Sequence, residues 1–209
     1  MDPQDMEFID ALTGSPGATW LLPVATVLAA VLVFWGTSRT LKHQRLRTLD
    51  ERFATAAEKL GHNQAAVRMA GVYAMASLAD DWEEQRQTCI DVLCSYLRLP
   101  CLRSLSGLQE GEREVRLSII RTITSHLREN AKTTWCGYHF DFTEAVIDGG
   151  NFKEARFTDG TTVIFHGAKF TGGETRFDRA EFGKCSIDFS GAAFIDGQVT
   201  FERATIKGG

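Results

Sequence analysis

The stretch from Val163 to Ile206, VIFHGAKFTGGETRFDRAEFGKCSIDFSGAAFIDGQVTFERATI, decides the fold of the C-terminal third of the chain. Pairs of large apolar residues five apart recur in it every twelve residues, at Phe165–Phe170, Phe177–Phe182, Phe189–Phe194 and Phe201–Ile206. An alanine lies two residues before the second member of each pair, and Val, Thr or Ile lies two before the first. The unit [VIT]xFxxAxFxxGx therefore predicts stacked coils of short strands, with large and small groups facing inward and glycine at tight corners.

Before this stretch the steps are shorter. Phe142, Ile147, Phe152 and Phe157 follow one another at intervals of five residues. A simple β-hairpin would need alternation with period two throughout, so the recurrence favours a solenoid over residues 138–209. Because twelve is not a multiple of five, either two residues bulge at one corner of each unit or the coil is not square.

The five-residue step resembles the pentapeptide repeat, A(D/N)LXX. Residues 52–100, RFATAAEKLGHNQAAVRMAGVYAMASLADDWEEQRQTCIDVLCSYLRLP, also resemble the segment between membrane helix and repeats in bacterial, especially actinobacterial, pentapeptide-repeat membrane proteins. The resemblance implies a right-handed quadrilateral β-helix whose central apolar residues point inward. The expected repeat core is Phe142, Ile147, Phe152, Phe157, Phe165, Phe170, Phe177, Phe182, Phe189, Phe194, Phe201 and Ile206.

A second decisive segment lies near the N-terminus. Residues 18–36, ATWLLPVATVLAAVLVFWG, carry no charge, and at 1.5 Å per residue a helix of this length spans roughly 28 Å, close to the hydrocarbon core of a bilayer. The acidic residues before it argue against a signal peptide, which begins with a basic region. We therefore expect a transmembrane helix, marked by Ala18, Trp20, Pro23, Trp35 and Gly36.

Basic residues set the expected orientation of this helix. Arg39, Lys42, Arg45 and Arg47 follow the apolar segment, and neither Lys nor Arg precedes it. The positive-inside rule then predicts a single-pass protein of the plasma membrane, with its N-terminus outside and the later domains cytoplasmic. The five cysteines show no paired spacing, which agrees with a reducing compartment.

The middle of the chain is predicted to be helical. We expect a short tail over residues 1–17, a juxtamembrane amphipathic helix over 37–62 and a small helical bundle over 63–130. The juxtamembrane stripe of Leu46, Leu49, Phe53, Ala56 and Leu60 is typical of a helix that packs on its own domain or pairs with another copy. The predicted fold class is thus a membrane-anchored α+β protein with a transmembrane helix, a helical bundle and a C-terminal β-helix.

Composition and motifs predict an interaction protein that is not an enzyme. The net charge of −4 argues against direct nucleic-acid binding. None of the five histidines has an acid or cysteine at ligand or triad spacing, and there is no phosphate loop, CxxC or HExxH motif. We expect no catalytic, metal or cofactor site. Two alternatives remain, a DNA mimic that protects DNA gyrase and an enzyme whose site forms only in three dimensions.

The expected partners follow from the same features. A bilayer would hold the apolar segment, and an unidentified protein would bind the rod. The far end of a solenoid without a cap exposes unpaired strand edges, which predicts self-association through that end or through the juxtamembrane helix.

Overall fold

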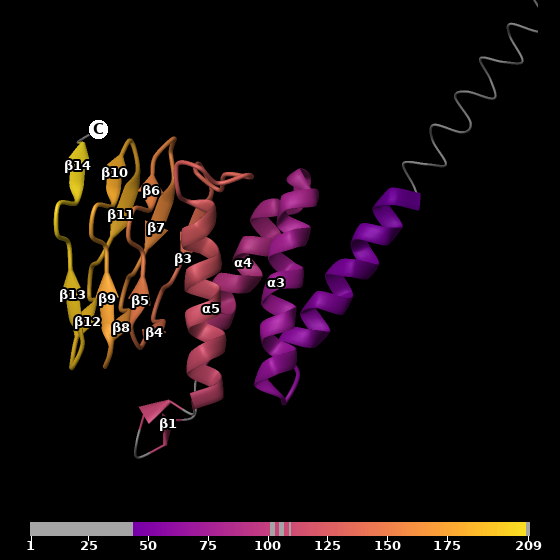
Figure 1. Ribbon diagram of the computed structural model, residues 1–209, viewed down its shortest axis with the longest axis horizontal. Helices are drawn as coiled ribbons and strands as arrows, with labels where there is room; N and C mark the ends of the chain where they lie inside the picture. Colours follow the sequence, from indigo (N-terminus) through magenta and orange to yellow (C-terminus); the bar gives the residue numbers. More distant parts are fainter. Residues whose placement is uncertain (1–43, 101–102, 105–106, 109, 208–209) are drawn as a thin grey trace, which may run out of the picture. The chain divides into compact units, whose positions relative to one another are not determined.

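The computed structural model describes residues 44–100, 103–104, 107–108 and 110–207 of the 209. The chain divides into two compact units, Met1–Thr48 and Leu49–Gly209. Only the helical residues 44–48 of the first unit are described, and they include the exposed Arg45 and Arg47. The second unit holds the remaining helices and all the described strands (Figure 1).

Helices form the first half of the second unit. After the helical stretch that ends at residue 60 come α3 (Ala65–Asp81), the 3-10 turn η1 (Glu83–Gln85), α4 (Arg86–Arg98) and α5 (Glu110–His126), with a small antiparallel pair, β1 (Arg103–Ser104) and β2 (Gly107–Leu108), before α5. Helix α3 contacts both α4 and α5. Their shared core consists of fully buried apolar side chains, among them Val72, Met75, Leu78, Ile90, Leu93, Val115, Ile119 and Ile123.

No helix in the described part of the chain is long and apolar enough to cross a membrane. Helices α3 and α5 have 17 residues each and carry charged side chains, whereas a crossing helix needs about 20 mostly apolar residues. This finding contradicts the predicted membrane-anchored fold class and the single-pass localisation at the plasma membrane. The residues behind that prediction, Ala18, Trp20, Pro23, Trp35, Gly36, Arg39 and Lys42, lie outside the described residues.

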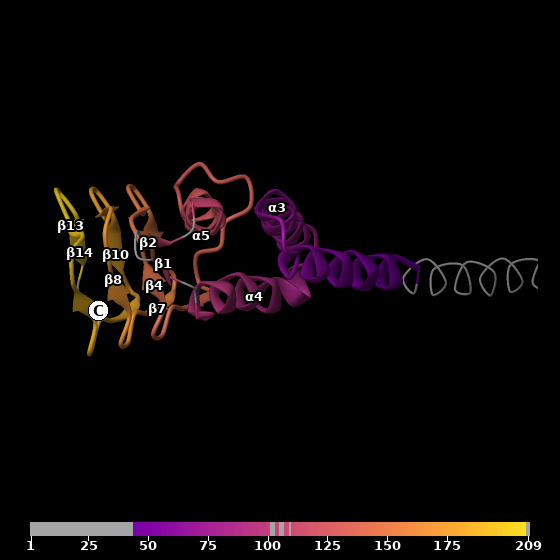
Figure 2. The same cartoon turned by 90° about the horizontal axis from the view of Figure 1, so that it is seen from below.

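The second half of the unit is a stack of parallel strands arranged in three rows of four (Figures 1 and 2). Row 1 contains β3 (His139–Asp141), β4 (Val146–Ile147), β5 (Gly150–Asn151) and β6 (Arg156–Phe157). Row 2 contains β7 (Thr162–Ile164), β8 (Lys169–Phe170), β9 (Glu174–Arg176) and β10 (Glu181–Gly183). Row 3 contains β11 (Ser186–Asp188), β12 (Ala193–Phe194), β13 (Gln198–Thr200) and β14 (Thr205–Lys207).

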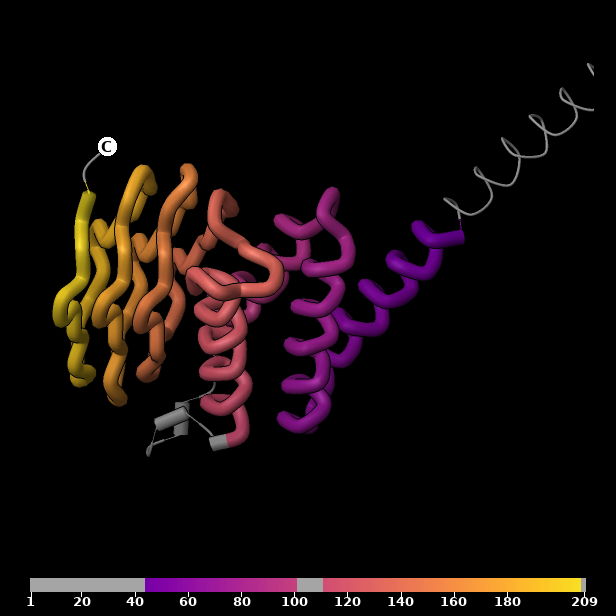
Figure 3. The backbone as a smooth tube through the Cα atoms, turned by 45° about the horizontal axis from the view of Figure 1, so that its top comes forward, coloured from indigo at the N-terminus to yellow at the C-terminus, as the bar shows by residue number. Residues whose placement is uncertain are grey.

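The structure also contradicts the predicted β-helix part of the fold class, because the strands do not form a closed solenoid. Each strand pairs only with its counterparts in the rows above and below, so the strands form four separate three-stranded parallel sheets. The physical reason is the corners, where the backbone turns away from the strand direction and the ladder of hydrogen bonds is interrupted. The stack of parallel strands is compatible with a β-helix-like fold, and Figure 3 shows the backbone passing from one row to the next.

The register explains the twelve-residue unit. Ser186 pairs with Thr162 and Ala193 pairs with Lys169, so the third row repeats the second after 24 residues. One unit of twelve residues therefore supplies two of the four strands of a row. Within rows 2 and 3 the core residues are alternately five and seven residues apart. The two extra residues of each seven-residue step lie at the corners after β8, β10 and β12.

The core of the stack consists of columns of aromatic rings. Phe142, Phe165 and Phe189 stack with centroids 5.0 and 4.9 Å apart, and Phe152, Phe177 and Phe201 stack at 4.7 and 5.0 Å. These distances match the spacing of neighbouring strands, so each ring lies flat against the ring of the next row. Phe157–Phe182 and Phe170–Phe194 form the other two ring pairs.

Helices α4 and α5 lie against row 1, where α4 contacts β3 and β4 and α5 contacts β5 (Figure 1). Gly150 occupies the place that Thr175 and Val199 hold in rows 2 and 3. A Cβ atom at Gly150 would lie 3.1 Å from Cδ1 of Ile120, so the glycine permits α5 to approach. One end of the stack is thereby covered by helices.

Candidate functional site

The fold brings together three side chains that are far apart in sequence. Nε2 of His126, at the end of α5, lies 3.2 Å from Oδ2 of Asp80, at the end of α3. Trp135, which is fully buried in the loop before β3, donates from Nε1 to Oδ1 of Asp80 at 3.1 Å. Its ring stacks on His126 with centroids 4.0 Å apart. The cluster joins two helices to the loop that leads into the strand stack.

This cluster does not have the geometry of a catalytic triad. Ser125 Oγ lies 3.4 Å from Nδ1 of His126, but the hydroxyl donates to the carbonyl of Thr122 at 2.7 Å. Nδ1 lies 2.7 Å from the same carbonyl oxygen, and this nitrogen must carry a proton to bond to it. A protonated Nδ1 has no lone pair with which to take the proton of Ser125, so a serine nucleophile is not activated here. The hydrogen bonds assign the cluster a structural role.

The described cysteines are free thiols. Burial raises the pKa of Cys89 to about 11 and that of Cys94 further above its ordinary value. Both thiols are therefore protonated at neutral pH and are poor nucleophiles. Within the described residues, no group of three or more His, Cys, Asp or Glu side chains is placed to hold a metal ion.

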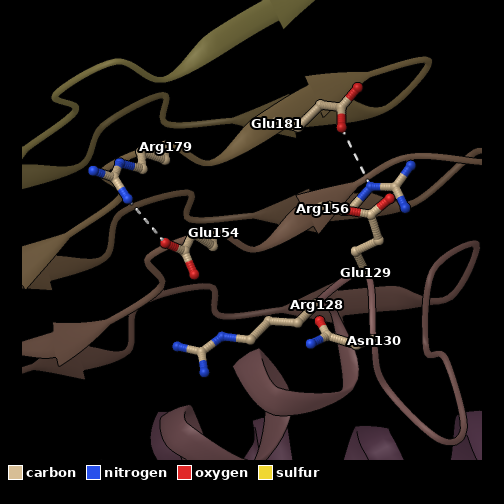
Figure 4. A pocket seen from close by; sticks show the side chains of 7 residues that line it. All are labelled: Arg128, Glu129, Asn130, Glu154, Arg156, Arg179 and Glu181. Atoms are coloured by element: carbon tan, nitrogen blue, oxygen red, sulfur yellow. Dashed lines mark hydrogen bonds and ion pairs between the residues drawn. The ribbon is translucent and has the colours of Figure 1, made fainter.

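A charged cleft of about 290 Å³ lies between the loop after α5 and the face formed by β6 and β10 (Figure 4). Two ion pairs cross from row 1 to row 2 in it, Arg156–Glu181 at 3.2 Å and Arg179–Glu154 at 3.4 Å. Arg128, Glu129 and Asn130 line the side nearest the helices. Lys207 of row 3 also contacts Glu181, at 2.7 Å. Charges of both signs alternate here, and the cleft shows neither an excess of positive charge nor one of negative charge.

The far end of the stack differs from the rest of its core. Phe170, Phe177 and Phe182 of row 2 are 1%, 0% and 5% exposed, whereas Phe194, Phe201 and Ile206, which occupy the same columns in row 3, are 54%, 45% and 82% exposed. Ile195 beside them is 54% exposed. We call the surface formed by the row 3 residues Ile187, Phe194, Val199, Phe201 and Ile206 the end face. In the described residues it is an apolar surface that nothing covers.

The structure places the predicted repeat core in the columns of the stack. Eight of these residues are buried: Phe142, Ile147, Phe152, Phe157, Phe165, Phe170, Phe177 and Phe182. Phe189 is partly buried, and the other three belong to the end face. Sequence reasoning did not find the cluster of Asp80, His126 and Trp135, because its members are 46 and 55 residues apart and only the fold brings them together.

Comparison with known proteins gave no relative: no protein-family model, curated protein or solved structure matches the chain.

Proposed function

We propose that this protein is a non-catalytic interaction protein of the pentapeptide-repeat type, which binds a protein partner through the end face of its strand stack. The abrupt change in exposure along the core columns supports this best. Rings that are buried in row 2 are open in row 3, and exposed clusters of large apolar side chains mark binding surfaces in folded proteins.

The pairing of charges on the stack favours this function over the DNA mimic. A mimic of DNA needs a continuous acidic stripe that resembles phosphates. On this stack Glu154 pairs with Arg179, Glu181 with Arg156 and Lys207, and Asp178 with Arg176. Each of these three acids faces a cation within 3.4 Å, so an acidic stripe that passed through them would be interrupted.

The contacts of the chemistry-bearing side chains favour it over an enzyme. The ring nitrogens of His126 face the Thr122 carbonyl and the Asp80 carboxylate. The thiols of Cys89 and Cys94 are buried, and their pKa values are raised by burial. These groups contribute to packing and hydrogen bonding, while the end face remains available for a partner.

A photo-crosslinking amino acid placed at Ile206 tests the proposal in the cells that make the protein. We expect a discrete crosslinked product at this position, because the side chain is open to a bound partner. The matched control is Tyr73, which is 52% exposed on α3. Equal crosslinking at both positions, or none at Ile206, would refute a binding role for the end face.

A further inference from the structure

We infer that a cavity among the helices binds an aliphatic monocarboxylate, with the carboxylate at its polar end and the hydrocarbon chain at its apolar end. The cavity has a volume of about 500 Å³, within the range of roughly 300–1,000 Å³ that is usual for small-molecule sites. It lies where the turn at residues 61–63 meets the end of α4 and the start of α5. It is separate from the end face, so the inference is independent of the proposed function. Three features of its walls support it: an excess of positive charge, free hydrogen-bond donors and an adjoining apolar space.

The polar end of the cavity carries more positive than negative charge. Of the described residues that line it, Arg68 and Arg116 are cations and Glu112 is the single carboxylate. Oε1 of Glu112 accepts from Arg116 at 3.0 Å, and Oε2 accepts from Arg68 at 3.1 Å. Burial and the nearby Glu112 raise the pKa of Tyr96 to about 12, so its hydroxyl, which donates to Oε2 at 3.0 Å, adds no negative charge. One carboxylate thus serves two guanidinium groups, and a second carboxylate would balance the charge.

Backbone carbonyls hold the two guanidinium groups in place without neutralising them. Arg116 is 4% exposed, and its Nη2 donates to the carbonyl of Leu99 at 2.7 Å. Nη1 of Arg68 donates to the carbonyls of His62 and Asn63, both at 2.8 Å. Salt and water screen such partly buried charges less than surface charges. An anion that enters the cavity therefore meets positive charge that is already in position, which lowers the cost of binding.

Hydrogen-bond donors are left over at the same end. Arg68 bonds to His62, Asn63 and Glu112 with three of its five N–H groups, and its buried Nε has no partner among the described residues. A buried N–H without an acceptor is unfavourable, and we expect an oxygen of the ligand to supply one. Nδ1 of His62 accepts from the backbone N–H of Gln64 at 3.1 Å, so a neutral ring has its proton on Nε2 and can donate from there.

The other end of the cavity adjoins an apolar space of about 280 Å³. The side chains and backbone around this space belong to Leu60, Gly61, Val92, Ser95, Tyr96 and Leu99. Leu60, Tyr96 and Leu99 line the larger cavity as well, so the two spaces are neighbours. Leu99 is 56% exposed at this place. A hydrocarbon chain would bury these apolar groups together with its own methylenes, each of which should tighten binding by about fourfold.

The single excess charge selects the class of ligand. A monocarboxylate matches one uncompensated guanidinium group. A phosphate ester, with a charge of about −1.5 to −2 at pH 7, would leave negative charge unpaired in a partly buried site. An aliphatic amine would be repelled by the two arginines, and an aliphatic alcohol would leave the excess positive charge without a partner.

Isothermal titration of the purified 209-residue chain with sodium decanoate tests the inference. We expect one decanoate to bind per chain, and octanoate, which has two methylenes fewer, to bind roughly ten- to twentyfold more weakly. Decylamine and decanol have the same chain without the carboxylate and should bind at least about tenfold more weakly than decanoate. A diazirine analogue of decanoic acid should label peptides that contain Leu60 or Leu99, and peptide mapping identifies them.

Two charge variants separate ligand binding from packing. Arg68→Gln removes the excess cation and should weaken decanoate binding about tenfold or more. Glu112→Gln removes the carboxylate that competes with the ligand and should tighten binding about threefold or more. Both substitutions break the same hydrogen-bonded group, so a purely structural role would weaken binding in both. Circular dichroism and melting establish that each variant is folded before binding is compared.

Variants of the exposed Leu99 test the apolar end and keep the inference testable if Arg68→Gln does not fold. Leu99→Glu should weaken decanoate binding about tenfold or more, because it removes apolar contact and adds a like charge. Leu99→Met should change binding by less than about threefold. Tyr73→Glu is the matched control, because Tyr73 is 52% exposed on α3 and does not line the cavity.

Four outcomes would overturn the inference. They are the absence of saturable decanoate binding, binding that survives Leu99→Glu, equal binding of decylamine, and labelling confined to peptides of the strand stack. A peptide with a C-terminal leucine that displaces decanoate and binds more tightly would also overturn it, by assigning the cavity to the C-terminus of a protein. The crosslinking at Ile206 tests the end face by itself, so the two proposals can fail separately.

Discussion

Phe152 and Phe177 lie face to face, with ring centroids 4.7 Å apart and ring planes 5° from parallel. Phe201 lies on the other side of Phe177 at 5.0 Å. A core ring of this stack is therefore buried by its own counterparts in adjacent rows. A phenylalanine in one column therefore contributes more to the free energy of unfolding when another row covers it than when it lies in the last described row.

Phe177→Ala should lower the free energy of unfolding by about 3–5 kcal/mol, because it opens a cavity between two stacked rings. Phe201→Ala, in the same column but 45% exposed, should cost roughly 1 kcal/mol or less. Urea unfolding measures both. Equal losses for the two variants would contradict the view that the next row buries the ring.

Backbone strain at the corners gives a second prediction. Glu144, Gly167 and Gly191 occupy equivalent corners with φ of 57°, 62° and 68°, in the left-handed region that favours glycine. Gly167→Ala should destabilise by about 1–2 kcal/mol, although a Cβ there would meet only Cγ of Glu144, at 3.4 Å.

Glu144→Gly should have the opposite sign. It relieves the strain but loosens the unfolded chain, so we expect a net gain of up to about 1 kcal/mol. Thermal melting of the two variants beside the wild type checks the pair. If Glu144→Gly lowered the melting temperature, the Glu144 side chain would stabilise the fold by more than its positive φ destabilises it.

The cluster at the helix ends gives a third prediction. Asp80→Ala removes the acceptor of the buried Trp135 indole N–H, and we expect a loss of about 1–3 kcal/mol. Asp81→Ala is the matched control, because this neighbour pairs with Arg52 at 2.8 Å on the surface and its loss should cost less than about 1 kcal/mol. The change in tryptophan fluorescence on unfolding, to which the buried Trp135 contributes, reports the transition. Comparable losses in the free energy of unfolding for the two variants would show that the hydrogen bond between Asp80 and Trp135 contributes no more than a surface ion pair.

The fourth prediction concerns acid. Hydrogen bonds from Lys207, and then from Arg156, lower the pKa of Glu181 below its ordinary value. A lowered pKa means that the folded state favours the carboxylate, so its stabilisation is complete above the unfolded value of about 4.3 and is lost as the pH falls through the lower, folded value.

Glu181→Gln should therefore be less stable than the wild type at pH 7 and should lose less stability between about pH 5 and pH 2. Because the pair is on the surface, 1 M NaCl should shrink the difference between the two proteins. Melting temperature as a function of pH is the measurement. Parallel curves for wild type and variant would exclude a contribution from this carboxylate.

Much of the strand stack could be predicted from the sequence, because its core repeats. The recurrence of Phe165, Phe177, Phe189 and Phe201 marks positions that face the same interior, and the structure places all four in ring stacks at the spacing of strands. A local sequence pattern is enough to predict these ring stacks, because the repeat period determines which residue lies next to which in the adjacent row.

The remaining features depend on contacts that no period encodes. Asp80 and Trp135 come together only after α3 and α5 have packed. The residues between them in the sequence carry no pattern that predicts the hydrogen bond from the Trp135 indole to the Asp80 carboxylate. The corners at Glu144, Glu154 and Arg179 have positive φ although none of these residues is glycine. Glycine occurs only at the corners equivalent to Glu144 in the next two rows, Gly167 and Gly191. The membrane prediction rested on the length, apolarity and flanking charges of residues 18–36, which lie outside the described residues, and no described helix is long and apolar enough to cross a membrane.

The division of a row into two like halves has a consequence for how the chain could change length. Because β9 and β10 repeat the pattern of β7 and β8, a duplication of twelve residues would rotate the later sequence by half a row and still set phenylalanine on phenylalanine and alanine on alanine. A duplication that did not match whole strand steps would break the columns. A step of twelve also keeps the order of five- and seven-residue spacings, so growth and shrinkage of this domain should proceed in steps of twelve, and each step would leave an end face of the same kind.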